Sequence, residues 1–137
     1  MALFNIVKRR KYSFEILLKK AVIDPAYRTE LYERILTEKL FVIHNTNTIP
    51  EGYSITTQGT KVQIVKLKNH KIPIFTSTNR IFDEGIIKEQ VNFLELTGES
   101  LLKALRDKTL ILNPYSEYAK EILPEEIERI LDGTINS

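Results

Sequence analysis

The stretch from residue 90 to residue 112 places strand-length apolar runs on both sides of a short helical pattern. Residues 90–96 and 109–112 read as strands, and between them Leu101 and Leu105 recur at helical spacing. A strand, a helix and a second strand in succession favour parallel strands in one sheet, although the two strands need not be neighbours. This order predicts an α/β fold in which helices pack on a sheet.

Helical periodicity also marks both ends of the chain. The apolar face of residues 12–23 has the spacing of an amphipathic helix and consists of Phe14, Leu17, Leu18, Ala21 and Val22. Asp24 and Pro25 supply an N-cap and a proline at the first helical position, which predicts a second helix up to about residue 39. Pro124 begins the last predicted helix, and Gly133 ends it.

Three segments between these helices have simple interpretations. Residues 40–43 form an apolar run of strand length, and residues 44–60 read as a long loop with room for one weak strand. Residues 115–123 can form a helix that faces inward through its tyrosines and Ile122. Because 137 residues with 42% hydrophobic side chains suffice for one core, we predict a single α/β (α+β) domain with helices packed on a mixed sheet of about five strands.

The central part of the chain predicts a hairpin. Residues 61–68 alternate like a strand, but the phase of the alternation slips at Ile64–Val65, which predicts a β-bulge. Residues 69–71 suit a tight turn, so we expect residues 72–76 to pair back on residues 61–68. Pro73 then has to lie at the start of its strand or direct its nitrogen away from the ladder.

Several classes of chemistry lack the residues that they require. The chain has no cysteine, which excludes disulfides and thiolate chemistry and fits a reducing compartment. No acidic residue stands at helical ligand spacing from His44 or His70, so we expect no metal site. The five glycines lack phosphate-binding spacing, and no serine lies in a nucleophile elbow. We therefore expect no cofactor, and a non-catalytic protein is favoured over an enzyme.

The charge is distributed unevenly along the chain. The net charge is +2, but residues 1–80 carry 14 basic and 6 acidic side chains, whereas residues 81–137 carry 6 and 12. If the two parts occupied different faces, the surface potential would be bipolar and would suit an oriented charged partner. We favour the alternative, in which early and late strands interleave in one sheet and the asymmetry vanishes in space.

A basic run, consisting of Lys8, Arg9, Arg10 and Lys11, follows an apolar start of the chain. A secretory signal has the opposite order, and no apolar run approaches the roughly 20 residues that span a bilayer, so we expect neither a signal nor a membrane span. Clustered cations beside aromatic residues can bind nucleic acid or an acidic lipid surface. The same pattern is typical of a solvated linker before a helix, and we favour that interpretation.

A second polar cluster follows the predicted strand that ends near residue 76. Thr76, Ser77 and Arg80 place hydroxyls, backbone N–H groups and a guanidinium together, which can hold a carboxylate, a phosphate or an acidic side chain of a partner. Alternatively, Ser77 or Thr78 only caps the helical turn that follows, and this interpretation is favoured.

The order of the segments resembles a known family. The pieces that carry the resemblance are Leu31-Tyr-Glu-Arg-Ile-Leu36, Leu40-Phe-Val42, Ile72-Pro-Ile-Phe-Thr-Ser77, Leu110-Ile-Leu-Asn-Pro114 and Leu123-Pro-Glu-Glu-Ile-Glu-Arg-Ile-Leu-Asp-Gly133. They resemble the N-terminal domain family of SseB, the enhanced-serine-sensitivity protein, over roughly residues 24–133. The resemblance implies a bacterial, cytoplasmic α/β domain without established activity, best regarded as a non-catalytic interaction or regulatory module.

The resemblance also sets expected domain limits. Residues 24–137 would form the SseB-like domain, and residues 1–23 would form an N-terminal extension with an extra amphipathic helix. Many relatives carry a second, C-terminal domain, and we expect none here because the chain ends at Ser137.

The leading hypothesis is a protein-interaction module that binds an unidentified protein partner, with self-association left open. Its predicted binding residues follow two strands that, if they are parallel neighbours, end side by side. These residues are Thr76, Ser77, Arg80, Asn113 and Tyr115. One alternative is a small anionic ligand or an enzymatic substrate held by the same hydroxyl and guanidinium groups. Another is binding of an anionic polymer or membrane surface through the basic run.

Overall fold

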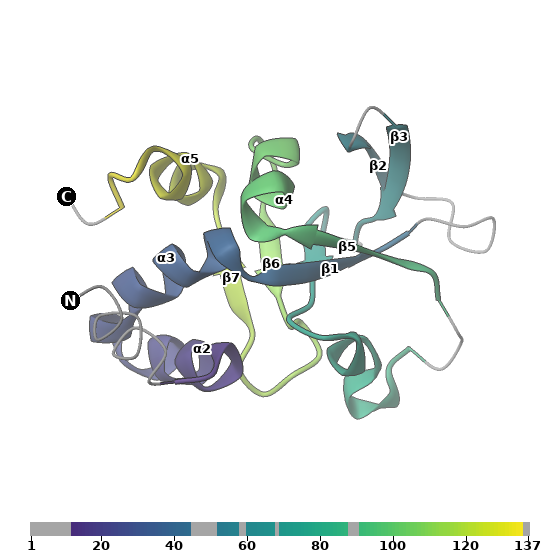
Figure 1. Cartoon of the computed structure of the whole chain (residues 1–137). Coiled ribbons are helices and arrows are strands. Elements are labelled where there is room, and N and C mark those ends of the chain that lie inside the picture. The colour runs from purple at the N-terminus through teal and green to yellow at the C-terminus, as the bar shows by residue number, and fades with distance from the viewer. Residues whose placement is uncertain (1–11, 45–51, 58–59, 68, 88–90, 136–137) are drawn as a thin grey trace.

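A mixed β-sheet with its α-helices on one face forms the centre of the molecule (Figure 1). The computed structural model describes residues 12–44, 52–57, 60–67, 69–87 and 91–135. Its strands are β1 (Lys39–Ile43), β2 (Gly52–Thr57), β3 (Thr60–Val65), β4 (Ile72–Ile74), β5 (Phe93–Thr97), β6 (Leu110–Leu112) and β7 (Lys120–Ile122). Its helices are α2 (Phe14–Ile23), α3 (Arg28–Thr37), α4 (Gly98–Ala104) and α5 (Pro124–Asp132), with 3-10 segments η1 (Pro25–Tyr27) and η2 (Thr78–Gly85).

Five of the strands form two small sheets that a single bridge joins. β1 pairs antiparallel with β5, while β4 pairs parallel with β6 and β6 pairs antiparallel with β7. Phe41 and Phe75 exchange two backbone hydrogen bonds of 2.9 Å each, which gives the order β5-β1-β4-β6-β7. The predicted mixed sheet of about five strands is confirmed. In this order β5 and β6 run in the same direction without being neighbours, as the strand–helix–strand pattern predicted.

Pro73 explains why β1 and β4 share only one bridge. The N–H of Ile72 donates to Thr109 on the β6 side, and the N–H of Phe75 donates to Phe41 on the β1 side. Alternation along the strand therefore directs the nitrogen of Pro73 toward β1. This nitrogen has no hydrogen to donate, so the ladder with β1 stops beside Phe75. Pro73 thus directs its nitrogen away from the β4–β6 ladder.

The two faces of the sheet bury two apolar clusters. The helical-face cluster packs the helices on alternate strand residues, which are Leu40, Val42, Ile72, Ile74, Leu110, Leu112 and Ile122. The η2-face cluster lies on the opposite face and contains Ile43, Val65, Phe75 and Ile81. Successive side chains of β1 and β4 point to opposite faces of the sheet, and both faces are covered by an apolar cluster.

The amphipathic helix near the N-terminus packs on its own domain. Phe14, Leu17, Leu18 and Ala21 are buried in the helical-face cluster, which confirms the predicted apolar face of α2. The Ser13 hydroxyl accepts a hydrogen bond from the N–H of Ile16 and caps the helix. The predicted α3, α4 and α5 are also present, with the N-cap of α4 at Thr97 and the C-cap of α5 at Gly133.

The helix predicted over residues 115–123 is wrong. The chain turns after Asn113, where the N–H of Ser116 donates to the carbonyl of Asn113 (3.1 Å), and then forms β7. Its apolar residues fit helical spacing, but pairing with β6 buries Ile122 just as well and also satisfies the backbone of β6. Tertiary pairing therefore decides the structure of this segment.

The hairpin predicted between residues 61–68 and 72–76 is also wrong. The turn exists, because the N–H of Leu67 donates to the carbonyl of Lys71 (2.8 Å), but β4 continues into the sheet between β1 and β6. β3 pairs instead with β2, the weak strand for which the sequence left room. Burial of Ile72 and Ile74 in the helical-face cluster favours this central position for β4.

The bulge predicted at Ile64–Val65 is likewise wrong. The register of β2 and β3 is continuous from the Gly52–Val65 pair to the Thr57–Thr60 pair. Ile64 is buried in the helical-face cluster and Val65 in the η2-face cluster. The two apolar residues are adjacent in the sequence because the two clusters cover opposite faces of the strand at its end, not because the strand carries an extra residue.

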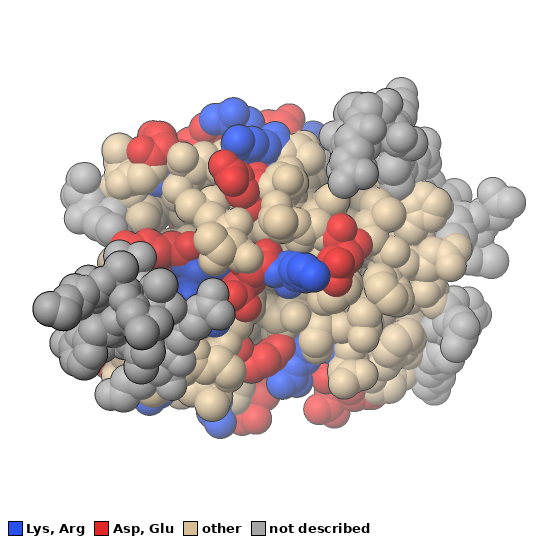
Figure 2. All heavy atoms as spheres, in the orientation of Figure 1, with Lys and Arg blue, Asp and Glu red and all other residues tan. Residues whose placement is uncertain are grey.

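The strand order interleaves the two oppositely charged parts of the chain. β1 and β4 belong to the basic part, whereas their neighbours β5 and β6 belong to the acidic part. Lys39 and Lys71 form ion pairs with Glu95 and Glu121 across this boundary. Basic and acidic side chains accordingly alternate on the face shown in Figure 2. None of the helices in the described ranges is long and apolar enough to cross a membrane.

Candidate functional site

The predicted site residues lie at the carboxyl ends of β4 and β6. The two strands are parallel neighbours, with Ile74 opposite Leu112. The polar residues that follow β4 therefore lie beside the Asn113 turn that follows β6. In open α/β sheets this end of parallel strands is the usual place for binding.

Asn113 joins the two strand ends. It is the one buried polar residue among those described, with 1% of its surface exposed, and its backbone has a φ of 50°. Its side-chain oxygen accepts a hydrogen bond from the N–H of Thr76 (3.0 Å), and its amide nitrogen donates to the Thr76 hydroxyl (2.9 Å). Asparagine tolerates the left-handed conformation better than most residues, so this position favours the residue that also makes both bonds.

A carboxylate from α2 completes the polar cluster. The Thr76 hydroxyl donates to one oxygen of Glu15, and the Nε of Arg80 donates to the other (3.2 Å). The Nη1 of Arg80 also donates to both oxygens of Asp83 (3.3 Å each). The first turn of α2 is thereby attached to the end of β4 and to η2.

The charges of this cluster compensate one another. Burial opposes the charge of Arg80, but the carboxylates of Glu15 and Asp83 raise the pKa of Arg80 above its usual value. The guanidinium therefore remains a cation held by two anions. An anionic ligand that approached Arg80 would have to compete with both carboxylates.

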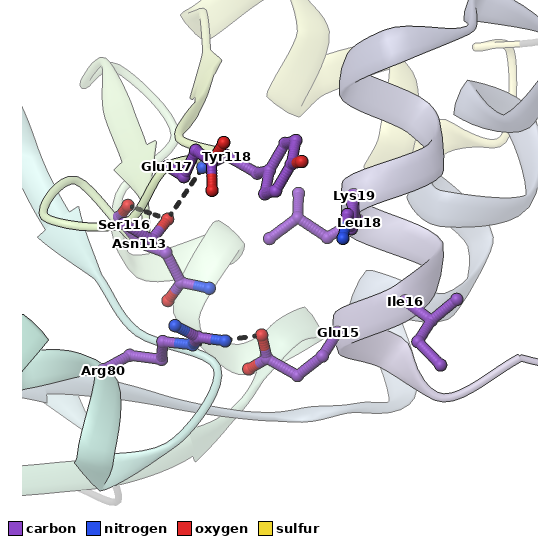
Figure 3. A pocket seen from close by; sticks show the side chains of 9 residues that line it. All are labelled: Glu15, Ile16, Leu18, Lys19, Arg80, Asn113, Ser116, Glu117 and Tyr118. Atoms are coloured by element: carbon purple, nitrogen blue, oxygen red, sulfur yellow. Dashed lines mark hydrogen bonds and ion pairs between the residues drawn. The ribbon is translucent and has the colours of Figure 1, made fainter.

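A hollow of about 270 Å³ opens between α2 and the turn that follows Asn113. We call it the α2–turn pocket. It is lined by Glu15, Ile16, Leu18 and Lys19 of α2, by Arg80, and by Asn113, Ser116, Glu117 and Tyr118 of the turn. Figure 3 shows the Glu15–Arg80 pair on one side of the pocket, and the Asn113 side chain extends from the turn toward Arg80.

The far side of the pocket combines a cation with an aromatic ring. The ammonium of Lys19 lies 5.0 Å from the centre of the Tyr118 ring, within the range of a cation–π interaction. The turn that presents Tyr118 is held by Ser116, whose hydroxyl donates to the carbonyl of Asn113 (2.8 Å) and accepts from the N–H of Tyr118 (3.2 Å). Figure 3 shows the Ile16 side chain on the other side of α2, directed away from Arg80 and Tyr118, where 48% of its surface is exposed.

The structure brings together some of the predicted site residues and separates others. Thr76, Arg80 and Asn113 form one hydrogen-bonded cluster. Ser77 occupies the N-cap position of η2, but its side chain makes no capping hydrogen bond. Tyr115 packs against Phe75 in the η2-face cluster, with ring centres 6.0 Å apart, and burial raises the pKa of its hydroxyl.

Sequence reasoning missed the contribution of α2. Glu15 and Lys19 lie off the apolar face of an amphipathic helix, where solvated charges are the usual interpretation. Their spacing of four residues placed them on one side of the helix, but nothing local indicated that this side faces Arg80 and Tyr118. The basic run Lys8, Arg9, Arg10 and Lys11 lies outside the described residues.

The polar groups of the pocket are engaged within the protein. Its one lining serine directs its hydroxyl to a backbone carbonyl, and neither histidine lines it. In the part of the chain that the structure describes, no group of three or more histidine and acidic side chains is placed to hold a metal ion. The arrangement can accept an apolar group beside Leu18 and the ring of Tyr118, and a polar or charged group beside Lys19.

Comparison with known proteins assigns the family. No curated protein and no solved structure gives a significant match to the chain. A family model does match, over residues 15–129, and its range begins inside α2 and ends inside α5. The model describes the SseB protein N-terminal domain, and the chain therefore belongs to this family.

Proposed function

We propose that this chain is a non-catalytic protein-interaction module whose α2–turn pocket receives a segment of a partner protein. The observation that carries the proposal is the composition of the pocket, in which Leu18 and the Lys19–Tyr118 pair lie beside polar groups that are already bonded to one another. A protein partner can cover such a mixed surface without displacing the internal bonds. Apolar anchors with a polar rim are typical of protein interfaces.

The pairing of Arg80 favours this proposal over an anionic-ligand site. Glu15 and Asp83 occupy the guanidinium from two sides, and Thr76 donates to the same Glu15 carboxylate. Sites that bind phosphate or carboxylate ligands usually leave such donors free for the ligand. The cytoplasmic location and the bacterial source implied by the resemblance stay predictions.

Site-specific photocrosslinking in the native cell tests the proposal. A photoreactive phenylalanine analogue replaces Tyr118, which lines the pocket, or Tyr27, which packs against Tyr12 and Lys20 and does not line it. We expect a discrete protein adduct from position 118 and none from position 27. Mass spectrometry of the adduct identifies the partner for binding studies with purified proteins.

Two neighbouring lysines provide a matched pair for those studies. Lys19 faces the pocket, whereas Lys20 lies over the rings of Tyr12 and Tyr27. We expect Lys19→Ala to weaken binding of the identified partner by about tenfold and Lys20→Ala to leave it unchanged. Equal effects of both substitutions, or adducts from both photoreactive positions, would contradict the pocket as the binding site.

A thermal-shift measurement separates the alternative class. Inorganic phosphate, nucleotides and amino acids are added to the purified chain and to its Arg80→Ala variant. We expect no stabilisation of either protein. A rise in melting temperature that requires Arg80 would favour the small anionic ligand instead, because a ligand that binds only the folded state stabilises it by mass action.

A further inference from the structure

The strand β5 forms one edge of the sheet, and the helical-face cluster covers only one of its two faces. It pairs with β1 along Phe93–Thr97, and its burial pattern includes no fully buried residue. Leu94 and Leu96 pack partly against the helical-face cluster, whereas Phe93 remains 45% exposed on the other face. β5 is therefore an edge strand whose first residue, Phe93, is an exposed apolar side chain.

The hydrogen bonds at both ends of the strand identify the groups that face outward. The N–H of His44 donates to the carbonyl of Asn92, just before β5, and the N–H of Gly98, just after β5, donates to the carbonyl of Glu38. The backbone groups of the even-numbered residues therefore face β1. Alternation along an antiparallel strand then directs the N–H and carbonyl groups of Phe93 and Glu95 away from β1. Within the described ranges, no residue donates a hydrogen bond to these groups or accepts one from them.

The side chains beside this edge are apolar and acidic. The rings of Phe93 and Phe41 are in edge contact, with centres 5.7 Å apart, on the face that η2 leaves partly uncovered. Glu95 is half-exposed, and its only cationic neighbour within 4 Å among the described residues is Lys39, at 3.9 Å. Figure 2 shows an area of uncharged side chains to the right of the acidic atoms that lie near β5.

The opposite edge of the sheet is shorter and carries more charged residues. β7 has three residues, and two of them, Lys120 and Glu121, are charged. Lys71 pairs with Glu121, and Lys120 lies near Glu126. Short, charged edge strands resist pairing with other chains, so β7 is protected in a way that β5 is not.

We propose that the edge of β5 binds an extended segment of a partner protein as an additional antiparallel strand. The outward N–H and carbonyl groups of Phe93 and Glu95 supply the main-chain hydrogen bonds. An apolar side chain opposite Phe93 and a basic side chain opposite Glu95, two residues apart in the partner, supply specificity. This surface does not include the α2–turn pocket, so the proposal stands independently of the proposed function.

Charge complementarity favours such a partner over a second copy of this chain. An antiparallel pair of β5 strands centred on Glu95 would place two carboxylates directly opposite each other. A basic side chain in that position instead meets an exposed carboxylate. From its N-terminus to its C-terminus, the segment that fits this edge therefore has a basic residue, then any residue, then an apolar residue.

Selection from a random heptapeptide library displayed on phage provides the probes. The substitution Glu95→Pro removes the outward N–H without breaking a bond to β1, and Glu95→Ala removes only the carboxylate. We expect enriched peptides with the basic–any–apolar pattern, a loss of affinity of about tenfold or more in Glu95→Pro, and a smaller loss in Glu95→Ala. Unchanged far-UV circular dichroism and melting temperature show that both variants fold.

Amide hydrogen exchange on the selected peptide complex tests the geometry directly. In the free protein the amides of Phe93 and Glu95 should exchange faster than those of Leu94 and Leu96, and the peptide should slow the first pair. Failure to enrich any peptide, or equal affinity for wild type and Glu95→Pro, would overturn the proposal. Concentration-dependent dimerisation that Glu95→Pro abolishes would also overturn it, because the occupant would then be a second copy of the chain.

Discussion

Asn113 is the residue on which the geometry of the candidate site depends most. Its side chain bonds both the N–H and the hydroxyl of Thr76, and its own N–H donates to the carbonyl of Ile74 (2.7 Å). Through Thr76 the same network reaches Glu15 on α2. Asn113, a buried residue with a left-handed backbone conformation, therefore links β4, β6 and α2 through its hydrogen bonds.

Substitution of Asn113 should separate the conformational effect from the hydrogen-bond effect. Asn113→Gly loses the side-chain bonds but adopts the φ of 50° without strain, whereas Asn113→Ala loses the bonds and is strained as well. We expect Asn113→Gly to lower the free energy of unfolding by about 2 kcal/mol and Asn113→Ala by about 1 kcal/mol more. Urea denaturation measures both values, and equal stability of the two variants would contradict the role of the backbone conformation.

Tyr32 should make the stability of the molecule sensitive to alkaline pH. It is buried between α3 and α5, and its hydroxyl donates to the Glu126 carboxylate (2.7 Å). Burial, followed by the contact with Glu126, raises the pKa of Tyr32 above its ordinary value of 10.0. Folding thus favours the protonated hydroxyl of Tyr32. The contribution of this hydroxyl to the free energy of unfolding is therefore complete below pH 10 and is lost as the pH rises through the folded-state pKa.

The variant Tyr32→Phe measures that contribution. We expect the wild type to exceed the variant by about 1 kcal/mol in free energy of unfolding at neutral pH. The difference should stay constant up to about pH 10 and shrink above it, as the unfolded-state hydroxyl ionises. Denaturation curves of both proteins at several pH values give the difference directly, and a difference that grows above pH 10 would contradict the assignment.

At the scale of the elements, the junction of β5 with α4 depends on a glycine. The N–H of Gly98 donates to the carbonyl of Glu38, which brings its backbone against the end of α3. A Cβ at this position would lie 1.6 Å from the carbonyl oxygen of Ile35. Only glycine fits between α3 and α4 here, although its own conformation requires nothing unusual.

The substitution Gly98→Ala should therefore be more damaging than a glycine substitution at a strained turn. We expect Gly98→Ala to cost about 3 kcal/mol, because backbone atoms of α3 would have to move. Gly133→Ala serves as the control, since its φ is 79° but nothing lies near the added methyl group, and we expect a cost of about 1 kcal/mol. Thermal unfolding of the two variants compares them, and the reverse order would contradict the close packing of α3 and α4.

The elements that the sequence predicted correctly are those whose signals are local. The apolar face of α2, the cap and proline before α3 and the Pro124–Gly133 limits of α5 depend on neighbours within a few residues. The errors concern segments whose partners lie far away in the chain. Residues 115–123 fit a helical spacing until β6 is available for pairing, and β3 takes β2 as its partner instead of β4.

The candidate site shows the same division. Thr76, Arg80 and Asn113 could be predicted because hydroxyl, guanidinium and amide groups follow strands whose carboxyl ends lie together. Glu15 could not, because it is 65 residues from Arg80 and its helix gives no sign of the surface that it meets. Sequence patterns therefore identified the strand side of the site, and the packing of α2 supplied the other side.

At the scale of the whole molecule, the fold brings segments from both parts of the chain to the α2–turn pocket. This pocket combines α2 with the turn between β6 and β7, and the β5 edge lies at the other end of the sheet order. The opposite charges of the two parts are mixed on the face shown in Figure 2. On that face, recognition of a partner would depend on local surfaces rather than on one large area of a single charge.

The most direct test of the α2–turn pocket compares two tyrosines, of which one lines the pocket. The ring of Tyr118 faces the pocket, whereas Tyr27 packs against Tyr12 and does not line it. Isothermal titration calorimetry with the partner identified by crosslinking measures the affinity of Tyr118→Ala and Tyr27→Ala. We predict a loss of about tenfold for Tyr118→Ala and wild-type affinity for Tyr27→Ala. Wild-type affinity of Tyr118→Ala would contradict the pocket as the partner-binding site.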